Sequence, residues 1–475
     1  MPNDAYQKLL ATRPKTDSLL LGWTDSATSR LGFHTGRSAP QHTNEPIWYD
    51  GPHLATVAPS GSGKCVSAAA PALLTYDGPA IVFDVKGELY SITHRRRREA
   101  GYREIKLDPF HVLGPDTDRC NFFDTFDLPN ADLDLDGQTL AKILSMGRGF
   151  SKDPFWELSA NGLNAGLMTY IAACEPPEKR NLVRLLELLH GNDVVYSLAV
   201  LLDTLGKKIP KFAYQEIAAF LELPDRETRP STLATAQSFV KGLNAARVAE
   251  TFCNSTFSLE ELRQNAPLTI YMIIPPDRMA SHACVIGLWV ATFLKTIFSR
   301  NVTPKRRTLL ILDEAAALGN FPPLETAVTL CRTYGLRVWS FWQSLQQIEA
   351  AFPTGWRTIL DNGAIQSFGT ASRLAARELS AIVDVRADEL MSLGPNRQVL
   401  QLSDGEPLRC RKLNYLRDAP FAGLFDENRY FAAGTEMADA TAGCAAADSA
   451  TGAGAARTPI DAAPVQHDTV ERGLS

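Results

Sequence analysis

The stretch Ala58-Pro-Ser-Gly-Ser-Gly-Lys-Cys65 decides the fold of this chain. It follows an extended apolar run at 54–57 and precedes a run of small residues at 66–74 that is typical of a helix. A strand, a glycine-rich turn and a helix in this order form the context of a phosphate-binding loop. Glycines let backbone N–H groups turn toward phosphate oxygens, and the helix N-terminus adds a favourable dipole. The sequence therefore predicts an α/β domain organised around a nucleotide-binding loop.

The predicted loop departs from the usual G-x-x-x-x-G-K-[ST] pattern at both ends. Ala58 stands in place of the first Gly, and Cys65 stands in place of the Ser or Thr that normally holds Mg²⁺. A thiol is a poor ligand for Mg²⁺, which prefers hard oxygen donors. Taken alone, the stretch is also compatible with a plain Gly/Ser turn before a helix. As a phosphate-binding loop, it predicts that Lys64 reaches the β and γ phosphates. The predicted nucleotide contacts are Pro59, Ser60, Gly61, Ser62, Gly63, Lys64 and Cys65.

The composition is that of an ordinary soluble protein. The chain has 475 residues, of which 45% are apolar and 21% are charged, which is enough for two or three domains. Its formal net charge of −5 excludes a uniformly basic chain, so any nucleic-acid-binding surface must be local. The eight cysteines are scattered and form no C-x-x-C pair. This spacing argues against a disulfide framework or a zinc site, and it fits a reducing cytosol.

No segment of the sequence has the length and composition expected of a membrane anchor. Residues 1–21 intersperse Lys, Arg and Asp among apolar residues, unlike a signal peptide. No window approaches about 18 uninterrupted apolar residues. The best candidate, 285–298, is shorter and contains Lys295. We therefore expect a cytoplasmic chain that has no transmembrane segment.

Two further predicted strands end in acidic residues. Residues 80–83 form a short apolar run that ends at Asp84, and residues 308–312 form another that ends at Asp313 and Glu314. Open α/β sheets bind their ligands at the carboxyl ends of the strands. We therefore expect Asp313 to hold Mg²⁺, with Asp84 as a further metal ligand. Glu314 is predicted to accept a proton from the attacking water.

A third apolar strand is predicted at 336–342, and it ends at Gln343. A Gln at this place can sense the γ phosphate or orient water, although a polar strand end is the simpler explanation. Arg332 is expected on a helix leading into this strand, and Arg337 at its start is compatible with a surface cap. The basic run at 94–98 is either a solvated helix end or a phosphate-contacting patch.

The chain between the predicted strands changes character, because helical periodicity dominates and β-branched runs vanish. We interpret this block as an all-helical insert between two halves of one α/β domain. Near the C-terminus the composition collapses to Ala, Gly, Thr and Asp, which cannot bury enough apolar surface to become ordered. The predicted segments are a loosely structured N-terminal lead-in at 1–45, a first domain half at 46–129, an all-α insert at 130–265, a second half ending in a D-G hairpin at 266–431, and a disordered tail at 432–475.

Several motifs together resemble the coupling-protein ATPases of type IV secretion and bacterial conjugation, the TraG/VirD-type family. The resemblance runs over residues 19–430. In that family the residue after the loop lysine is often not Ser or Thr, so Cys65 is a mild departure. The motifs, in chain order, are His53-Leu-Ala-Thr-Val-Ala-Pro-Ser-Gly-Ser-Gly-Lys64, Phe83-Asp-Val-Lys-Gly-Glu88, Asp153-Pro-Phe-Trp-Glu157, Leu312-Asp-Glu-Ala-Ala-Ala-Leu-Gly319, Tyr334-Gly335 and Trp342-Gln-Ser-Leu-Gln-Gln-Ile348.

The resemblance implies a RecA-like P-loop NTPase motor domain that carries an inserted all-α domain, forms homo-hexamers and hydrolyses ATP with Mg²⁺. It implies that DNA, single- or double-stranded, and relaxase or effector proteins are recruited and moved into a type IV secretion channel at the bacterial inner membrane. By position, Lys64, Asp313, Glu314 and Gln343 carry over as nucleotide-binding and catalytic residues. Arg332 matches the place of a proposed arginine finger that acts in trans.

Members of this family usually carry N-terminal transmembrane helices, and this sequence shows none. We therefore expect peripheral docking at the inner membrane through partner proteins. Two alternatives stay open: a soluble hexameric DNA pump that is not tied to a channel, and a cargo-recruitment adaptor that binds ATP but hydrolyses it weakly. The acids Asp313 and Glu314 argue against the adaptor, whereas Cys65 and the lack of basic charge keep it open.

Overall fold

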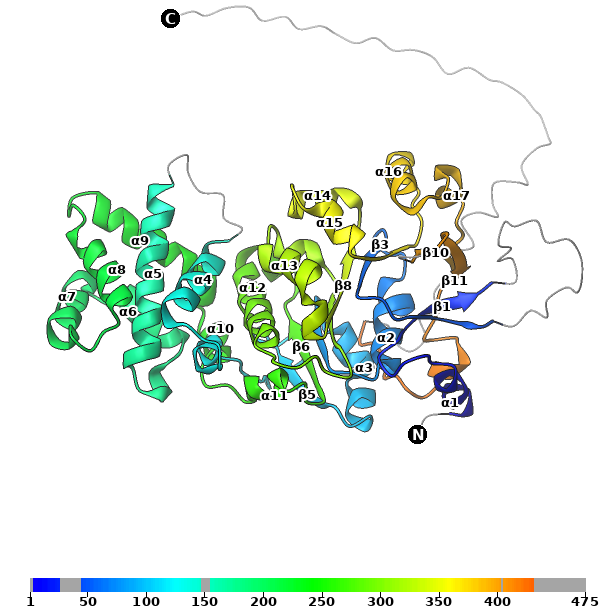
Figure 1. The fold of residues 1–475 in the computed structure, drawn as a ribbon, viewed down its shortest axis with the longest axis horizontal. Helices are drawn as coiled ribbons and strands as arrows, with labels where there is room; N and C mark the ends of the chain where they lie inside the picture. The colour runs from blue at the N-terminus through cyan, green and yellow to red at the C-terminus, as the bar shows by residue number, and fades with distance from the viewer. Residues whose placement is uncertain (1–2, 26–43, 147–153, 403–404, 431–475) are drawn as a thin grey trace, which may run out of the picture. The chain divides into compact units, whose positions relative to one another are not determined.

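The computed structural model describes residues 3–25, 44–146, 154–402 and 405–430 (Figure 1). The chain divides into two compact units, Met1–Arg429 and Tyr430–Ser475. The first unit contains every helix and strand of the described chain. The predicted disordered tail at 432–475 lies outside the described residues, as does part of the predicted D-G turn.

An eleven-stranded sheet runs through the first unit in the order β2-β1-β11-β10-β9-β3-β8-β7-β4-β6-β5. From β9 to β5 the neighbouring strands are parallel, whereas the strands from β9 to β2 pair antiparallel. The predicted strands of the α/β domain and the C-terminal hairpin are confirmed. The strands are β1 (Leu19–Thr24), β2 (Pro46–Tyr49), β3 (His53–Val57), β4 (Ala80–Asp84), β5 (Arg103–Leu107), β6 (Leu268–Ile273), β7 (Thr308–Leu312), β8 (Leu336–Trp342), β9 (Gly363–Ser367), β10 (Arg397–Gln401) and β11 (Leu408–Arg411).

Side chains that alternate along the central strands divide the core between the two faces of the sheet. In β3, Ala55 and Val57 belong to one buried cluster and Leu54 belongs to the other. The central strands β3, β4, β7 and β8 are buried along their whole length, as parallel strands covered on both faces must be. The Leu54 face packs against α1 (Asp4–Ala11), α2 (Ala70–Thr75) and α3 (Glu88–Glu99), and the opposite face packs against α12 (Pro276–Phe298), α13 (Pro322–Leu330), α14 (Leu345–Ala351), α15 (Trp356–Asp361), α16 (Arg373–Val383) and α17 (Ala387–Met391).

Only helices are assigned to the described residues between β5 and β6. Their apolar side chains join the buried cluster on the α12 face, so the block shares its core with the sheet. Lys295 of α12 forms an ion pair of 2.6 Å with Asp136 of this block. The predicted fold class, an α/β domain with an all-α insert, is confirmed. The α-helices of the block are α4 (Leu133–Ser145), α5 (Phe155–Cys174), α6 (Leu182–His190), α7 (Val194–Leu205), α8 (Lys211–Glu222), α9 (Thr228–Val240), α10 (Ala246–Thr251) and α11 (Leu259–Arg263).

The prediction of a loosely structured lead-in at 1–45 is wrong for its described part. Asn3 caps α1 by accepting a hydrogen bond from the Tyr6 amide, and β1 lies inside the sheet between β2 and β11. The run Leu19-Leu-Leu21 is buried, although the residues before it in the sequence are mixed polar. Burial of these apolar side chains stabilises the pairing of this segment with the sheet. The N-terminal segment is therefore part of the α/β domain.

The basic run at 94–98 belongs to the C-terminal half of α3, and its arginines are engaged within the protein. Arg97 is buried and donates to the backbone carbonyls of Tyr76 and Gly78. Its neighbours have their own partners: Arg95 pairs with Glu99 and Asp426, Arg96 donates to the Tyr6 hydroxyl, and Arg98 pairs with Glu104. The hypothesis of a phosphate-contacting patch is therefore not supported, and α3 is instead tied to its surroundings.

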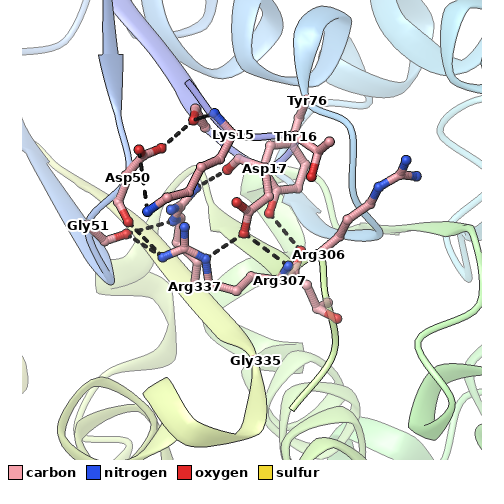
Figure 2. A network of polar contacts seen from close by, with 12 residues as sticks. Lys15, Thr16, Asp17, Asp50, Gly51, Tyr76, Arg306, Arg307, Gly335 and Arg337 are labelled. Atoms are coloured by element: carbon pink, nitrogen blue, oxygen red, sulfur yellow. Dashed lines mark hydrogen bonds and ion pairs between the residues drawn. The ribbon is translucent and has the colours of Figure 1, made fainter. Parts of the chain in front are cut away.

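A polar network at the amino ends of the central strands holds the N-terminal segment (Figure 2). Arg307 forms an ion pair of 2.6 Å with the buried carboxylate of Asp17 and donates to the carbonyls of Asp50 and Gly51. Arg337 is fully buried and donates to the carbonyls of Asp17 and Gly51. The surface cap considered for Arg337 is therefore wrong, because its guanidinium satisfies backbone carbonyls that the strand ends leave free.

The helix α12 has the length and composition of a membrane span, although two thirds of its most apolar window is buried in the fold. The bent pair of helices α6 and α7 passes the same test only if it is counted as one span. The apolar window noted at 285–298 lies within this helix, which begins at Pro276 and contains a non-helical residue, His282. Its buried residues from Val285 to Ile297 belong to the core, which explains its apolar composition.

Candidate nucleotide-binding site

The loop predicted from the sequence connects β3 to a helical segment, as a phosphate-binding loop requires. Gly61 and Gly63 have φ values of +75° and +87°, which residues with a Cβ rarely adopt. Ser62 Oγ donates to the Pro59 carbonyl over 2.6 Å, and the Lys64 ammonium donates to the Ala58 carbonyl over 3.0 Å. The lysine thus folds back across the loop, in the position from which it could contact phosphate oxygens.

A one-turn π-helix opens the helical segment, over Cys65–Ala69, before α2 continues it. The Ser67 amide donates to the Gly63 carbonyl over 2.8 Å, so the first turn closes directly onto the loop. The first amides of a helix have no partner within it, and they carry the positive end of its dipole. The loop and this helix start together present a concave group of backbone donors that fits an anion.

Register places the other predicted site residues along the same edge of the sheet. The order β3-β8-β7-β4 puts the loop after β3, Gln343 after β8, Asp313 after β7 and Asp84 at the end of β4. Leu312, the last residue of β7, is in register with Phe83 of β4, and the Asp313 amide donates to the Phe83 carbonyl over 3.3 Å. Four motifs that are far apart in the sequence therefore meet at adjacent carboxyl ends, which is where α/β sheets bind ligands.

The two aspartates of this edge are held in a poorly solvated environment. Burial, together with the charge of neighbouring acids, raises the pKa of Asp84 to about 7 and that of Asp313 to about 6. Asp84 Oδ2 accepts a hydrogen bond of 2.8 Å from the Tyr90 amide. Asp84 Oδ1 is buried and has no hydrogen-bond partner among the described residues. An orphaned carboxylate oxygen beside a second carboxylate is a reasonable place for a divalent cation or its water.

Glu314 and Gln343 form a direct pair at the carboxyl ends of β7 and β8. The Gln343 side-chain amide donates to Glu314 Oε2 over 3.0 Å, and the Gln343 backbone amide donates to Gln347 Oε1 over 2.7 Å. The charge of Glu314 and that of Asp313 both act to raise the pKa of Lys64, against the larger opposite effect of its burial. The structure thus brings Lys64, Asp313, Glu314 and Gln343 together, as the sequence predicted from three separate motifs.

Cys65 lies in the same environment and is half-buried. Burial raises the pKa of its thiol well above the usual value, and the carboxylates of Asp313, Glu88 and Asp84 raise it further. The side chain is therefore a neutral thiol, which is a poor ligand for Mg²⁺. Within the described residues, no group of three or more His, Cys, Asp and Glu side chains could hold a metal alone. A metal here would need oxygen donors from a bound nucleotide and water as well as from Asp313 and Asp84.

Arg332 is not brought to this chain's loop. It is exposed on a short 3-10 helix, Cys331–Tyr334, before the amino end of β8, whereas Gln343 follows the carboxyl end of that strand. A seven-residue strand separates the two ends by roughly 20 Å. Arg332 contributes instead to the positive charge near His53, whose pKa is lowered to about 4 mainly by burial. Any contact between Arg332 and a nucleotide would have to involve a second copy of the chain.

One residue beside the loop was missed in the sequence. Lys412 follows β11, is only 6% exposed, and donates to the Ser62 carbonyl over 3.1 Å. It lies 350 residues after Ser62 in the sequence, and no motif surrounds it. Only the placement of β11 in the sheet brings it there, so no signal in the sequence could have found it.

Comparison with known proteins agrees with this geometry. The family model described as "Type IV secretory system Conjugative DNA transfer" matches residues 22–381. The chain belongs to this family. The match covers the loop, both acidic strand ends and Gln343, so the residues that form the site lie within the family domain.

Similar curated proteins are coupling and transfer proteins. The chain is 23% identical over 419 residues to the "Type IV secretion system-coupling protein VirD4" of Bartonella quintana (strain Toulouse), covering 80% of this chain and 65% of that protein. It is 24% identical over 391 residues to the "Conjugal transfer protein TraG" of Escherichia coli, covering 78% of this chain and 61% of that protein. The chain thus spans somewhat less than two thirds of the length of these relatives.

Similar solved structures are those of the plasmid coupling protein TrwB. One in complex with ADP and Mg²⁺ has a TM-score of 0.62 and 18% sequence identity, covering 86% of this chain and 97% of that chain. Another, in complex with the non-hydrolysable ATP analogue ADPNP, has a TM-score of 0.61 at the same identity, covering 86% of this chain and 98% of that chain. This likeness confirms the RecA-like P-loop fold with an all-α insert.

The high pKa of Asp84 leads to a test that needs no nucleotide. Replacing Asp84 by Asn should raise the melting temperature of the nucleotide-free protein more at pH 8 than at pH 5. The pKa of Asp84 is about 7 in the folded protein and about 3.9 in the unfolded chain, so ionisation of this carboxyl destabilises the folded protein. The loss in free energy of unfolding that Asp84 causes is absent below about pH 4, grows as the pH rises toward 7, and is constant above that value. Thermal melting of wild type and Asp84→Asn at both values measures the effect.

The matched control for this test is Asp203→Asn, an exposed aspartate on α7. It should change the melting temperature little at either pH. An Asp84→Asn variant that shifts melting equally at pH 5 and pH 8 would show that Asp84 does not titrate abnormally in the folded chain.

Proposed function

We propose that this chain is an ATP-hydrolysing coupling protein that recruits DNA or nucleoprotein substrates and moves them into a type IV secretion channel. The observation that carries the proposal is the alignment of Lys64, Asp313, Glu314 and Gln343 at adjacent carboxyl ends of one sheet. Membership of the conjugative DNA transfer family supports the choice of substrate. Nucleotide binding is supported by TrwB, a protein of similar fold whose structures contain ADP with Mg²⁺ and an ATP analogue.

The protein's own residues would divide the work of hydrolysis between binding, orientation and proton transfer. Loop amides and Lys64 would hold the phosphates, while Asp313 and Asp84 would orient the metal through their oxygens. Glu314 would accept the proton of the attacking water, and its hydrogen bond from Gln343 would fix the carboxylate. Bound Mg²⁺ would help to neutralise the charge that develops on the transferred phosphoryl group.

The position of Arg332 favours a ring in which copies of the chain complete one another's sites. It is exposed and lies at the opposite edge of the sheet from its own loop. An arginine that reaches a neighbour's nucleotide would stabilise transition-state charge in trans. We therefore propose a homo-hexamer, with relaxase or effector proteins as further partners and peripheral association with the inner membrane through channel components.

The two alternatives predict different responses to DNA and to partners. A DNA pump without a channel would show DNA-stimulated hydrolysis and no interaction with secretion proteins. An adaptor would bind ATP but hydrolyse it very slowly. The hydrogen-bonded pair of Glu314 and Gln343 favours hydrolysis, because an adaptor has no use for an oriented carboxylate at this place.

Steady-state ATP hydrolysis tests the proposal directly. We expect a basal rate that rises when single- or double-stranded DNA is added, and that disappears in Lys64→Ala because phosphate binding is lost. Lys207→Met, at an exposed lysine of the all-α insert, is a matched control outside the loop. ATP binding that depends on Lys64 without turnover, with or without DNA, would favour the adaptor over the motor for the isolated chain.

A further inference from the structure

Lys412 is a buried cation with an unusual set of partners. Its side chain is only 6% exposed, and its Nζ lies 3.1 Å from the Ser62 carbonyl oxygen and 4.1 Å from the centre of the Phe368 ring. Its backbone amide donates to the Asn396 carbonyl over 2.8 Å, which fixes the residue at the start of the chain that leaves β11. A carbonyl dipole and a ring face stabilise an ammonium, but neither carries a full negative charge.

The charge of Lys412 is therefore not balanced. Within the described chain it forms no ion pair with an Asp or Glu, and burial lowers the pKa of its ammonium to about 8. Burying an unpaired charge is costly, and the cost falls when a counter-ion arrives. The loop that Lys412 contacts is the proposed binding place of a polyphosphate.

The geometry of the peptide bond between Ser62 and Gly63 gives Lys412 a second effect. In a trans peptide the C=O and N–H groups point in opposite directions. Since the Ser62 carbonyl points toward Lys412, the Gly63 amide points away from it, and Gly63 adopts the positive φ of +87°. No acceptor in the described part of the protein takes the Gly63 amide hydrogen in a hydrogen bond. This amide is thus available to a ligand on the far side of the peptide plane.

A cavity of about 390 Å³ adjoins the loop on the side of Lys412. Its walls include the loop residues Pro59, Gly61 and Ser62, together with Phe368 and Lys412. The ammonium thus stays next to an open space beside the loop. It can keep its contact with the Ser62 carbonyl while the loop adjusts to a ligand.

We propose that Lys412 is a second cation of the phosphate site, which holds the Ser62 carbonyl so that the Gly63 amide faces the nucleotide and which is itself stabilised when the nucleotide binds. This inference rests on the nucleotide binding proposed above. It makes Lys412 a positioning residue that acts through the loop. The contact also joins the nucleotide loop to the hairpin of β10 and β11, on the opposite side of β3 from Asp313.

The test compares nucleotide affinity with the stability of the free protein in Lys412→Met and Lys412→Arg. Titration with Mg²⁺–ADP and Mg²⁺–ATP should show affinity about 10-fold lower in Lys412→Met, since hydrogen bonds made by charged groups are the strong ones. Lys412→Arg retains the charge and should retain more of the affinity. Without nucleotide, Lys412→Met should melt at the same or a higher temperature than wild type, because an unbalanced buried charge has been removed.

The outcomes separate this inference from the proposed function. Wild-type nucleotide affinity in Lys412→Met, whatever its melting temperature, would show that Lys412 only packs the hairpin. The inference would then be overturned. Lys64→Ala, titrated in parallel, should lose nucleotide binding. If wild type binds no nucleotide, or if Lys64→Ala binds as tightly as wild type, the proposed nucleotide site fails and the inference fails with it. Lys207→Met, at an exposed lysine of the all-α insert, is the control for the loss of a lysine charge.

Discussion

Replacing Glu314 by Gln should lower the kcat of ATP hydrolysis by roughly 10²–10⁴-fold while ATP still binds, because general-base catalysis typically contributes that much. The substitution keeps the size of the side chain and removes only its capacity to accept a proton. The Gln343 amide can still donate to the remaining carbonyl oxygen, so the local geometry should survive. Single-turnover hydrolysis and nucleotide titration, measured on the same preparation, separate chemistry from binding.

Gln343→Ala is the informative companion to this experiment. It removes the donor that lies 3.0 Å from Glu314 Oε2 and leaves the base itself in place. We expect a smaller loss of kcat than in Glu314→Gln, with little change in nucleotide affinity. Glu314→Gln with near-normal turnover would exclude Glu314 as the base and would point to another acid of the site.

The second large effect is expected on stability, from Arg307→Met. This change leaves the buried carboxylate of Asp17 without its partner at 2.6 Å and also removes donors to two backbone carbonyls (Figure 2). Removing one partner of a buried ion pair typically costs about 3–5 kcal/mol. Chemical denaturation should therefore show a much lower free energy of unfolding for Arg307→Met than for wild type.

The neighbouring residue provides a matched control. Arg306 pairs with Asp77 over 3.2 Å; the Arg306 side chain is exposed and that of Asp77 is partly exposed. Because exposed ion pairs contribute about 0–1 kcal/mol, Arg306→Met should change the free energy of unfolding little. Adding Asp17→Asn to Arg307→Met should recover part of the lost stability, since the uncompensated charge is then removed. Equal losses in the free energy of unfolding for Arg306→Met and Arg307→Met would show that the ion pair with Asp17 stabilises the protein no more than an exposed pair does.

Much of the α/β fold and its site could be predicted because the relevant signals are local. Each central strand is a short apolar run, and the residue type changes abruptly at its carboxyl end, at Asp84, Asp313 and Gln343. A strand that is buried on both faces consists mainly of apolar residues, so an acid or amide directly after such a run indicates the edge of the sheet. This rule needs no knowledge of strand order.

The features that could not be predicted depend on contacts between distant segments. Arg337 was considered a surface cap because arginine is rarely fully buried, and only the carbonyls of Asp17 and Gly51 make its burial favourable. β1 was missed because mixed polar residues precede its three leucines. Lys412 was missed because its role depends on the position of β11 in the sheet.

The pairing of β1 with β11 has a consequence for how the protein is made. Trp23 of the first strand is in register with Arg411 of the last, so a ribosome must synthesise almost the whole α/β domain before this pair can form. Until then β1 has a neighbour only in β2, and its other edge can pair with foreign strands. Contacts between such distant residues also slow folding. Closure of this side of the sheet is therefore expected to be a late step, and nascent chains interrupted before β10 should be prone to aggregation.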